Sequence, residues 1–248
     1  MFKLKLADTD LLRNSMPIIA EIIDEGTFKI DKNGMSLLSP DRTMVSVVDF
    51  KILSSAFEDF KIDGEESIGL NMSSFVSVLK RLKTGDKLTL ESSENKLRMI
   101  IEGSGMRTFT LPIIDVQSEK PPLDQLDFGG KVELDSSIVE EGIADADIIG
   151  DSVIFEAGPN MFKMHSKGDV SSTELSMGKD NQGITGITAE NNIKAQYPLE
   201  YLKKMIKATK LSKQTTIEFG NDYPMRLTFK AIDKMSLNFI LAPRVIED

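Results

Sequence analysis

Two ranges of the chain, 73–83 and 198–210, place apolar residues at the spacing of one helix face. The apolar positions are Phe75, Val78, Leu79 and Leu82 in the first range, and Leu199, Leu202, Met205, Ile206 and Thr209 in the second. Lysine and arginine occupy the opposite faces, so both ranges are predicted to be amphipathic helices lying on a core. Two further helices are predicted after Asp8 and Asp135, which suit the N-cap position. Pro17 falls inside the first of these and is expected to kink it or to begin a new turn.

Between these helices the pattern is typical of strands. In 28–38, "FKIDKNGMSLL", apolar residues flank Asn33-Gly34, which is a strong signal for a two-residue hairpin turn. The ranges 87–101 and 215–229 are predicted as further hairpins. In the terminal "NFILAPRVIED" (238–248), alternation places Phe239 and Leu241 in the core. Pro243 is expected to end strand pairing and to leave the backbone after it free to pair with a bound peptide.

The chain carries one pattern twice, at an offset of 127 residues. The aligned blocks are 8–16 with 135–143, 27–39 with 154–166, and 74–83 with 201–210. We therefore expect two copies of one domain, 1–115 and 131–248, joined by a linker at 116–130 that prolines and glycines punctuate. Each copy should have an α+β fold in which two helices pack on one face of antiparallel sheet.

Composition limits the classes of function. The 248 residues are 40% hydrophobic, and no apolar run approaches the roughly 18 residues that a membrane span needs. The first ten residues lack the long apolar segment of a signal peptide. The absence of cysteine excludes disulfides, thiolate nucleophiles and cysteine-bound zinc. These features favour a cytoplasmic protein without membrane contact.

Charge is distributed unevenly. The net charge of −9 argues against a general nucleic-acid binder, because the mean field repels phosphate. However, 73–83 and 198–210 each carry +3, whereas 135–148 carries −5 and no base. The basic residues of a single helix commonly form no more than an ordinary solvent-exposed face. Two matched basic helices in an acidic chain favour a polyanion held at one surface.

No catalytic constellation can be built from the sequence. His165 is the single histidine and is predicted to be an ordinary strand residue. Gly103 and Gly105 lack the third glycine of a dinucleotide-binding loop and are predicted to form a turn. The acids of 135–148 lie on one exposed helix, where solvation is favoured over metal binding. We expect no catalytic residue, no metal and no cofactor.

Five segments together resemble the sliding clamps of DNA replication, the family of proliferating cell nuclear antigen (PCNA), in its archaeal form. They are "GMSLLSPDRTMVSVVDF" (34–50), "IGLNMSSFVSVLK" (68–80), "RTFTLPIIDV" (107–116), "FGNDYPMRL" (219–227) and "FILAPRVIED" (239–248). The likeness runs in order over almost the whole chain. It implies a clamp fold and a homotrimeric ring closed head to tail, with duplex DNA passing through the pore.

The resemblance implies that helices line the pore and hold DNA phosphates without reading bases. The lining residues on this chain would be Arg13, Lys80, Arg81, Lys83, Lys203, Lys204, Lys207 and Lys210. It also implies a subunit joint, which we expect near 107–113 and 171–177. There Arg81, Lys83 and Arg107 of one subunit would pair with Glu141 and Asp145 of the next. The alternative is that these acids are merely solvated.

Clamp relatives bind short PCNA-interacting peptides in an apolar pocket beside the linker and the C-terminal segment. On this chain the pocket would comprise Met44, Val45, Val47, Leu123, Leu126, Pro224, Ile240, Ala242, Pro243 and Arg244. The implied partners are a clamp loader, DNA polymerase, flap nuclease and ligase, bound without catalysis by the chain itself. Two alternatives stay open: a subunit of a heterotrimeric or non-replicative clamp, and an enzyme using exposed carboxylates.

Overall fold

The computed structural model of this chain describes residues 1–117 and 121–244. The described residues divide into two compact units. The described residues of the first unit are 1–44, 48–117, 121 and 231–237, and those of the second unit are 45–47, 122–230 and 238–244. The domain boundaries expected from the sequence, 1–115 and 131–248 with a linker between them, stay a prediction.

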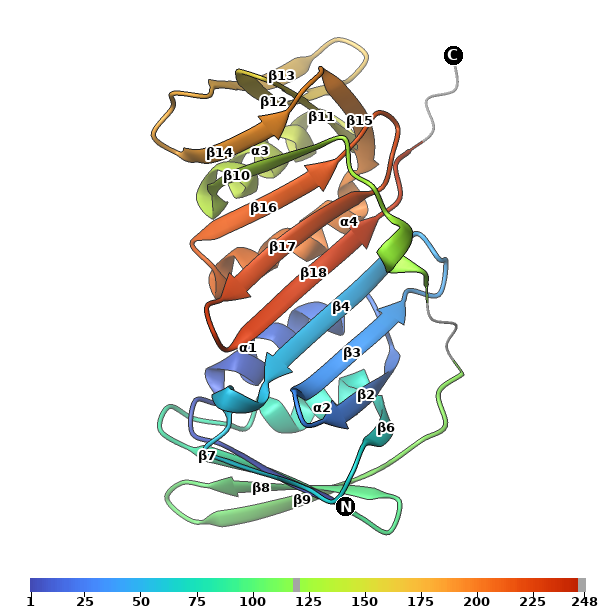
Figure 1. The fold of residues 1–248 in the computed structure, drawn as a ribbon, viewed down its shortest axis with the longest axis vertical. Coiled ribbons are helices and arrows are strands. Elements are labelled where there is room, and N and C mark those ends of the chain that lie inside the picture. The colour runs from blue at the N-terminus through green and yellow to red at the C-terminus, as the bar shows by residue number, and fades with distance from the viewer. Residues whose placement is uncertain (118–120, 245–248) are drawn as a thin grey trace. The chain divides into compact units, whose positions relative to one another are not determined.

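The described part of the first unit holds two antiparallel strand arrays. One has the order β6-β2-β3-β4 and the other the order β5-β1-β7-β8-β9. In Figure 1, α1 and α2 lie on one face of the first array, and the two helices contact each other. The elements are β1 (Phe2–Leu6), α1 (Asp10–Ile19), β2 (Glu25–Asp31), β3 (Gly34–Pro40), β4 (Ser46–Leu53), η1 (Ser54–Ala56), β5 (Asp59–Ile62), β6 (Glu66–Asn71), α2 (Met72–Leu79), β7 (Lys87–Ser93), β8 (Lys96–Glu102) and β9 (Met106–Pro112).

The second unit has the same design. Its arrays are β15-β11-β12-β13 and β14-β10-β16-β17-β18, with α3 in contact with α4 (Figure 1). The elements are η2 (Leu123–Gln125), β10 (Gly130–Asp135), α3 (Ser136–Ile149), β11 (Ser152–Gly158), β12 (Met161–Lys167), β13 (Ser172–Gly178), β14 (Ile184–Ala189), β15 (Ile193–Pro198), α4 (Leu199–Met205), η3 (Ile206–Leu211), β16 (Gln214–Phe219), β17 (Met225–Ala231) and β18 (Met235–Leu241).

The internal repeat is confirmed by the element positions. The strands β11, β12 and β15 and the helix α4 each begin 127 residues after β2, β3, β6 and α2, respectively. The strand orders correspond as well, since β6-β2-β3-β4 matches β15-β11-β12-β13. The predicted α+β fold with two repeated domains is therefore correct.

The apolar helix faces pack inward as predicted. Phe75, Leu79, Leu202 and Met205 are at most 1% exposed, and each sits in the core of its own unit. The range 198–210 is not one continuous α-helix, because α4 passes into the 3-10 turn η3 at Ile206. Phe239 and Leu241 are fully buried, as alternation predicted.

Helix ends differ in detail from expectation. Asp8 is not the N-cap of α1; Thr9 occupies that position and makes no side-chain capping bond. Asp135 is the N-cap residue of α3, but its side chain makes no capping bond either. A true side-chain cap is found on α2, where the Asn71 side chain accepts a hydrogen bond from the Ser74 N–H at 2.9 Å. Pro17 lies in the last turn of α1, which ends two residues later at Ile19.

The three predicted hairpins are present. In the first, Asp31 pairs with Gly34, so the turn residues are Lys32 and Asn33, one position earlier than the sequence suggested. Gly34 is required for a different reason: its φ is +140°, and a Cβ there would lie 2.0 Å from the Ile52 carbonyl oxygen. The β7–β8 hairpin turns through Glu94 and Asn95, both with positive φ, as a two-residue hairpin turn needs.

Candidate DNA-facing helices, subunit edges and docking segment

Unpaired cations gather at the end of α2. Lys80, Arg81 and Lys83 follow its last turn and are exposed. None of these three side chains forms an ion pair with any acidic side chain of residues 1–117 and 121–244. Their charges therefore stay available to an external anion, which is what the DNA-lining prediction requires of them.

The cations of α4 and α1 are partly neutralised by their own chain. Lys203 lies 2.8 Å from Asp147, and Lys204 lies 3.2 Å from Glu200 and 5.2 Å from the centre of the Tyr201 ring. Arg13 is half-buried and lies 2.7 Å from Asp10. The remaining two predicted lining residues, Lys207 and Lys210, are exposed.

A hollow of about 530 Å³ lies between α3 and α4. Lys203, Lys204 and Lys207 line it from α4 and η3, and Asp147 lines it from α3. The local charge is thus mixed, and the basic character of this surface is weaker than the sequence count of +3 indicated.

The acids of α3 fall into two groups. Glu140 accepts a hydrogen bond from the Thr209 hydroxyl at 3.2 Å, and Asp147 pairs with Lys203, so both face the second helix of the same unit. Glu141 and Asp145 are exposed and form no ion pair within the described part of the chain. They are four residues apart, so they share one face of α3. This division was not visible in the sequence, which showed only an acidic helix.

The strands β9 and β13, near which the subunit joint is predicted, each lie at the end of an array. Each has seven residues, and most positions along each strand alternate between exposed and half-buried. On β9, Phe109 and Leu111 stay half-buried although their neighbours on β8, Met99 and Leu97, are fully buried. An added strand would cover these apolar side chains and pair the open backbone edge.

Each of these edge strands runs beside a helix of distinct charge. The helix α2, with its exposed cations, contacts β9. The helix α3, with Glu141 and Asp145, contacts β13. The two edges are therefore of equal length and flanked by opposite charges.

Arg107 at the start of β9 is already engaged within its own unit. Its Nη2 donates to the Asp86 carboxylate at 2.8 Å, and its Nη1 donates to the Arg81 carbonyl at 3.2 Å. The sequence treated Arg107 as an interface cation only. Whether it also reaches a neighbouring subunit stays a prediction.

Most residues of the predicted peptide pocket lie in the second unit. Val45, Val47, Leu123, Leu126, Pro224, Ala242 and Pro243 are half-buried there, whereas Ile240 is only 6% exposed. The Ala242 N–H donates to the Val45 carbonyl at 2.9 Å, which holds the C-terminal segment beside Val45 within the second unit. Because Ile240 is almost fully buried, a bound peptide would contact only a small part of its side chain. The final four residues, 245–248, lie outside the described residues.

The expectation that the backbone after Pro243 is free was wrong. The Arg244 N–H donates to the Gln196 carbonyl at 2.7 Å, and the Arg244 guanidinium lies 2.6 Å from Asp151. The hydrogen bond from Arg244 lowers the pKa of the Asp151 carboxyl below its ordinary value. The segment is thus held by main-chain and side-chain contacts on both sides of the proline.

The end of the linker is anchored in a way that sequence reasoning missed. The Phe128 ring packs edge-on against Tyr223 at 6.0 Å, and the Arg226 guanidinium lies 4.7 Å from the centre of the Phe128 ring. The Asp127 N–H donates to the Tyr223 hydroxyl at 3.4 Å. An aromatic residue directly before Gly129-Gly130 was the available signal, because linkers are usually polar.

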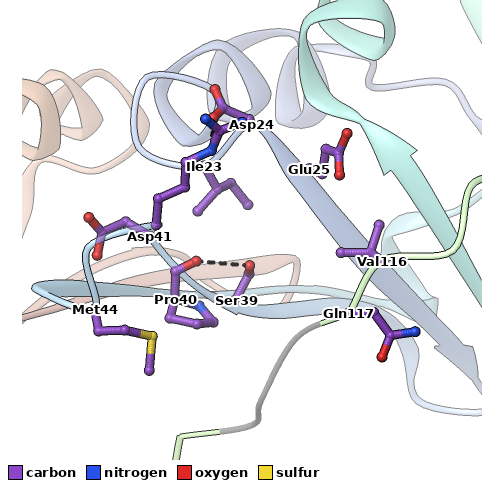
Figure 2. A pocket seen from close by; sticks show the side chains of 10 residues that line it. Ile23, Asp24, Glu25, Ser39, Pro40, Asp41, Met44, Val116 and Gln117 are labelled. Carbon is purple, nitrogen blue, oxygen red and sulfur yellow. Dashed lines mark hydrogen bonds and ion pairs between the residues drawn. The ribbon is translucent and has the colours of Figure 1, made fainter.

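Met44 belongs to the first unit, where it lines a separate hollow of about 400 Å³. Figure 2 shows Ile23, Asp24 and Glu25 facing Pro40 and Met44 across it, with Val116 and Gln117 on a third side. Arg42, also on this wall, lies 2.8 Å from Asp24. Met44 is 60% exposed and has a φ of +59°, which is strained for a methionine.

His165 lies on β12, as predicted, and its Nε2 is 3.0 Å from Glu156. In the described ranges, no three His, Cys, Asp or Glu side chains group as a metal site. No helix within those ranges is both long and apolar enough to cross a bilayer.

Two copies of one α+β domain in a single chain, with matched strand orders, define a two-domain clamp fold. The family model for the N-terminal domain of proliferating cell nuclear antigen matches residues 1–119, and the model for its C-terminal domain matches residues 123–244. The chain therefore belongs to the proliferating cell nuclear antigen family.

Relatives and solved structures agree with this assignment. The DNA polymerase sliding clamps of Pyrococcus abyssi and Pyrococcus horikoshii are each 35% identical over 229 residues, which is 92% of this chain and 92% of theirs. A PCNA2–PCNA3 complex from Sulfolobus tokodaii contains a chain with a TM-score of 0.90 at 27% identity, covering 98% of this chain and 99% of that one. PCNA from Thermococcus kodakaraensis has a TM-score of 0.92 at 22% identity, covering 98% and 100%, and supports the fold alone.

Proposed function

We propose that this chain is a DNA sliding clamp, a processivity factor that encircles duplex DNA and tethers a replicative polymerase. The observation that carries the proposal is the family match along both domains, together with relatives named DNA polymerase sliding clamps. In this role the chain catalyses nothing. It acts in the cytoplasm on the DNA of the cell, and its two domains are 1–115 and 131–248.

The pore would be formed by a homotrimer closed head to tail, with β9 of one subunit against β13 of the next. The equal strand lengths, the half-buried Phe109 and Leu111, and the opposite charges beside the two edges support this arrangement. Arg81, Lys83 and Arg107 would face Glu141 and Asp145 of the neighbour. Because exposed ion pairs contribute only about 0–1 kcal/mol each, they would set register while the strand pairing supplies most of the affinity.

Duplex DNA would be held by mobile contacts to phosphate. Lys80, Lys83 and Lys210 are exposed and carry no ion pair in the described ranges, and the net charge of −9 repels DNA from the rest of the surface. The proposed lining set remains Arg13, Lys80, Arg81, Lys83, Lys203, Lys204, Lys207 and Lys210. Contacts of this kind read no bases, so the ring can move along the duplex.

Partner proteins would dock on the second unit beside the C-terminal segment. Val45, Val47, Leu126 and Ala242 offer half-buried apolar surface there, suited to a short peptide with aliphatic and aromatic anchors. We propose polymerase, flap nuclease and ligase as users of this surface, and a clamp loader as the protein that opens the ring.

One experiment tests the function directly. With a clamp loader and ATP present, polymerase extension on a primed circle is measured with and without the protein, and then on the same molecule after linearisation. A clamp raises product length on the circle only, because it slides off free ends. Equal stimulation of both templates, or none of either, would contradict the proposal. The mass of the pure chain in solution separates a homotrimer from one subunit of a mixed ring.

A further inference from the structure

Asp86 is a buried carboxylate that joins three segments of the first unit. The residue is 6% exposed. Its Oδ2 accepts hydrogen bonds from the Lys83 N–H at 3.0 Å and from Arg107 Nη2 at 2.8 Å. The Asp86 N–H in turn donates to the Lys83 carbonyl at 3.1 Å. One side chain thus ties the turn after α2 to the first residues of β9.

The third segment is the β8–β9 hairpin. A Cβ placed on Gly103 would lie 2.0 Å from Asp86 Oδ1, so the carboxylate occupies the space where a side chain would stand. A Cβ on Gly105, in the same turn, would meet nothing within 4 Å. Neither glycine has a positive φ, so the difference between them is the presence of Asp86 alone. Position 103 therefore favours glycine because the Asp86 carboxylate occupies the space that a side chain would fill.

Arg107 is held in one orientation by this arrangement. Its two terminal nitrogens are used by Asp86 and by the Arg81 carbonyl, yet its side chain stays 34% exposed. A guanidinium offers five N–H donors, so others remain for a second acceptor outside the chain. An arginine that is already ordered loses less side-chain entropy when that acceptor arrives.

We propose that Asp86 is the positioning residue of the subunit joint, acting through Arg107 and the start of β9 without touching the neighbouring subunit. The inference rests on the proposed ring. Asp86 fixes Arg107 before assembly and holds the edge strand in register with the cations Arg81 and Lys83. Loss of this order should weaken each joint about twofold to tenfold, which corresponds to immobilising one long side chain on assembly.

Two variants remove the contact in different ways. Asp86→Asn removes the charge, whereas Gly103→Ala keeps every charge and displaces the carboxylate by its methyl group. Gly105→Ala is the matched control. Light scattering along a dilution series gives the concentration at half-assembly. We expect it to rise at least about twofold for Asp86→Asn and Gly103→Ala, and to stay unchanged for Gly105→Ala.

A positioning role is separated from general stabilisation by a double-mutant cycle. Arg107→Gln and Glu141→Gln are combined, and their coupling in the assembly constant is measured in the parent and again in the Asp86→Asn background. The coupling should vanish when the carboxylate is absent. Circular dichroism melts identify any variant that fails to fold; should Asp86→Asn fail, the cycle is run in the Gly103→Ala background.

The outcomes are distinct. A trimeric parent with unchanged Asp86→Asn and Gly103→Ala assembly overturns the role of Asp86 and leaves the clamp intact. Tighter assembly of Asp86→Asn also overturns it, because Asp86 would then compete with the neighbour for Arg107. A coupling between Arg107 and Glu141 that persists in the Asp86→Asn background likewise overturns the role of Asp86. A parent chain that stays monomeric at every concentration overturns the ring itself, and the joint with it.

Discussion

The ammonium group of Lys203 on α4 lies 2.8 Å from the carboxylate of Asp147 on α3. The side chains are about half exposed, at 51% and 42%, so the pair is formed in contact with water. Lys203 is one of the eight cations expected to face DNA, and its charge is partly neutralised within its own chain, as are those of Lys204 and Arg13. The pair lowers the positive charge that this surface offers to an external anion.

Replacement of Asp147 by asparagine should strengthen binding to DNA. Lys203 is released and each subunit gains one positive charge, so the plot of log affinity against log salt should steepen by about one unit for each new phosphate contact. Fluorescence anisotropy with a short duplex at several salt concentrations measures the slope. Glu190→Gln, which changes the same charge in the β14–β15 turn, is the control and should leave the slope unchanged. An equal change in both variants would show that only net charge matters.

Replacement of Glu141 by glutamine should weaken the ring, whereas the same change at Glu140 should not. Glu141 has no ion pair in the described chain, while Glu140 accepts a bond from Thr209 of its own unit. The loss per joint should be small, up to roughly fivefold, as befits an exposed ion pair. Gel filtration at decreasing concentration compares the two variants. If Glu140→Gln dissociates the ring more readily than Glu141→Gln, the assignment of the α3 faces is wrong.

Met44 is expected to lower the stability of the fold through its backbone conformation. Its φ of +59° is unfavourable for any residue with a Cβ, so the Met44→Gly variant should be more stable than Met44→Ala by about 1 kcal/mol. The usual order in folded proteins is the reverse. Denaturant unfolding measures this difference, and alanine matching or exceeding glycine in stability would refute the strain argument.

Ala242→Arg should abolish or strongly weaken binding of a PCNA-interacting peptide. Ala242 is half-buried and its N–H is bound to Val45, so the main chain there is held in place and the proposed site must accommodate the larger, charged side chain. A charge placed against an apolar anchor should reduce affinity at least about tenfold. Isothermal titration gives the affinity, with Thr188→Arg on the exposed face of β14 as the control. Undiminished binding would place the peptide site elsewhere.

The sequence alone predicted the features that depend on short or periodic patterns of residues. Apolar spacing located the four α-helices of the described ranges, and the offset of 127 gave the repeat, because a helix face and a strand pair each repeat their own short pattern. It was insufficient where two distant segments meet. Which of Glu140 and Glu141 is paired depends on the approach of η3, 69 residues later in the chain. The link between Arg107 and Asp86 depends likewise on how β9 lies beside the turn after α2.

Two further predictions were wrong because each depends on a contact between segments that are distant in the sequence. The first hairpin turns at Lys32 and Asn33 because the close approach of Ile52 to Gly34 fixes the register. Pro243 does not free the backbone after it, since Gln196 of β15 supplies an acceptor that no local pattern reveals. At both places the deciding contact comes from a residue that is distant in the sequence.

The Arg244–Asp151 pair should make the C-terminal segment sensitive to acid. The hydrogen bond from Arg244 is the main cause that holds the pKa of Asp151 below its ordinary value of 3.8. Because the folded-state pKa is depressed, the contribution to stability is fully present above the ordinary value and is lost as the pH falls through the folded-state pKa. Both side chains are well exposed, so the contribution should be at most about 1 kcal/mol.

Asp151→Asn tests this linkage. At pH 7 the variant should unfold at a slightly lower denaturant concentration than the parent, and it should bind the peptide less well because the segment carrying Ala242 is held less firmly. As the pH falls below the folded-state pKa of Asp151 the two proteins should converge, since the parent then loses the same carboxylate by protonation. Asp169→Asn, in the β12–β13 turn, serves as control and should follow the parent throughout. A difference that persists in acid would mean that Asp151 acts through contacts other than its charge.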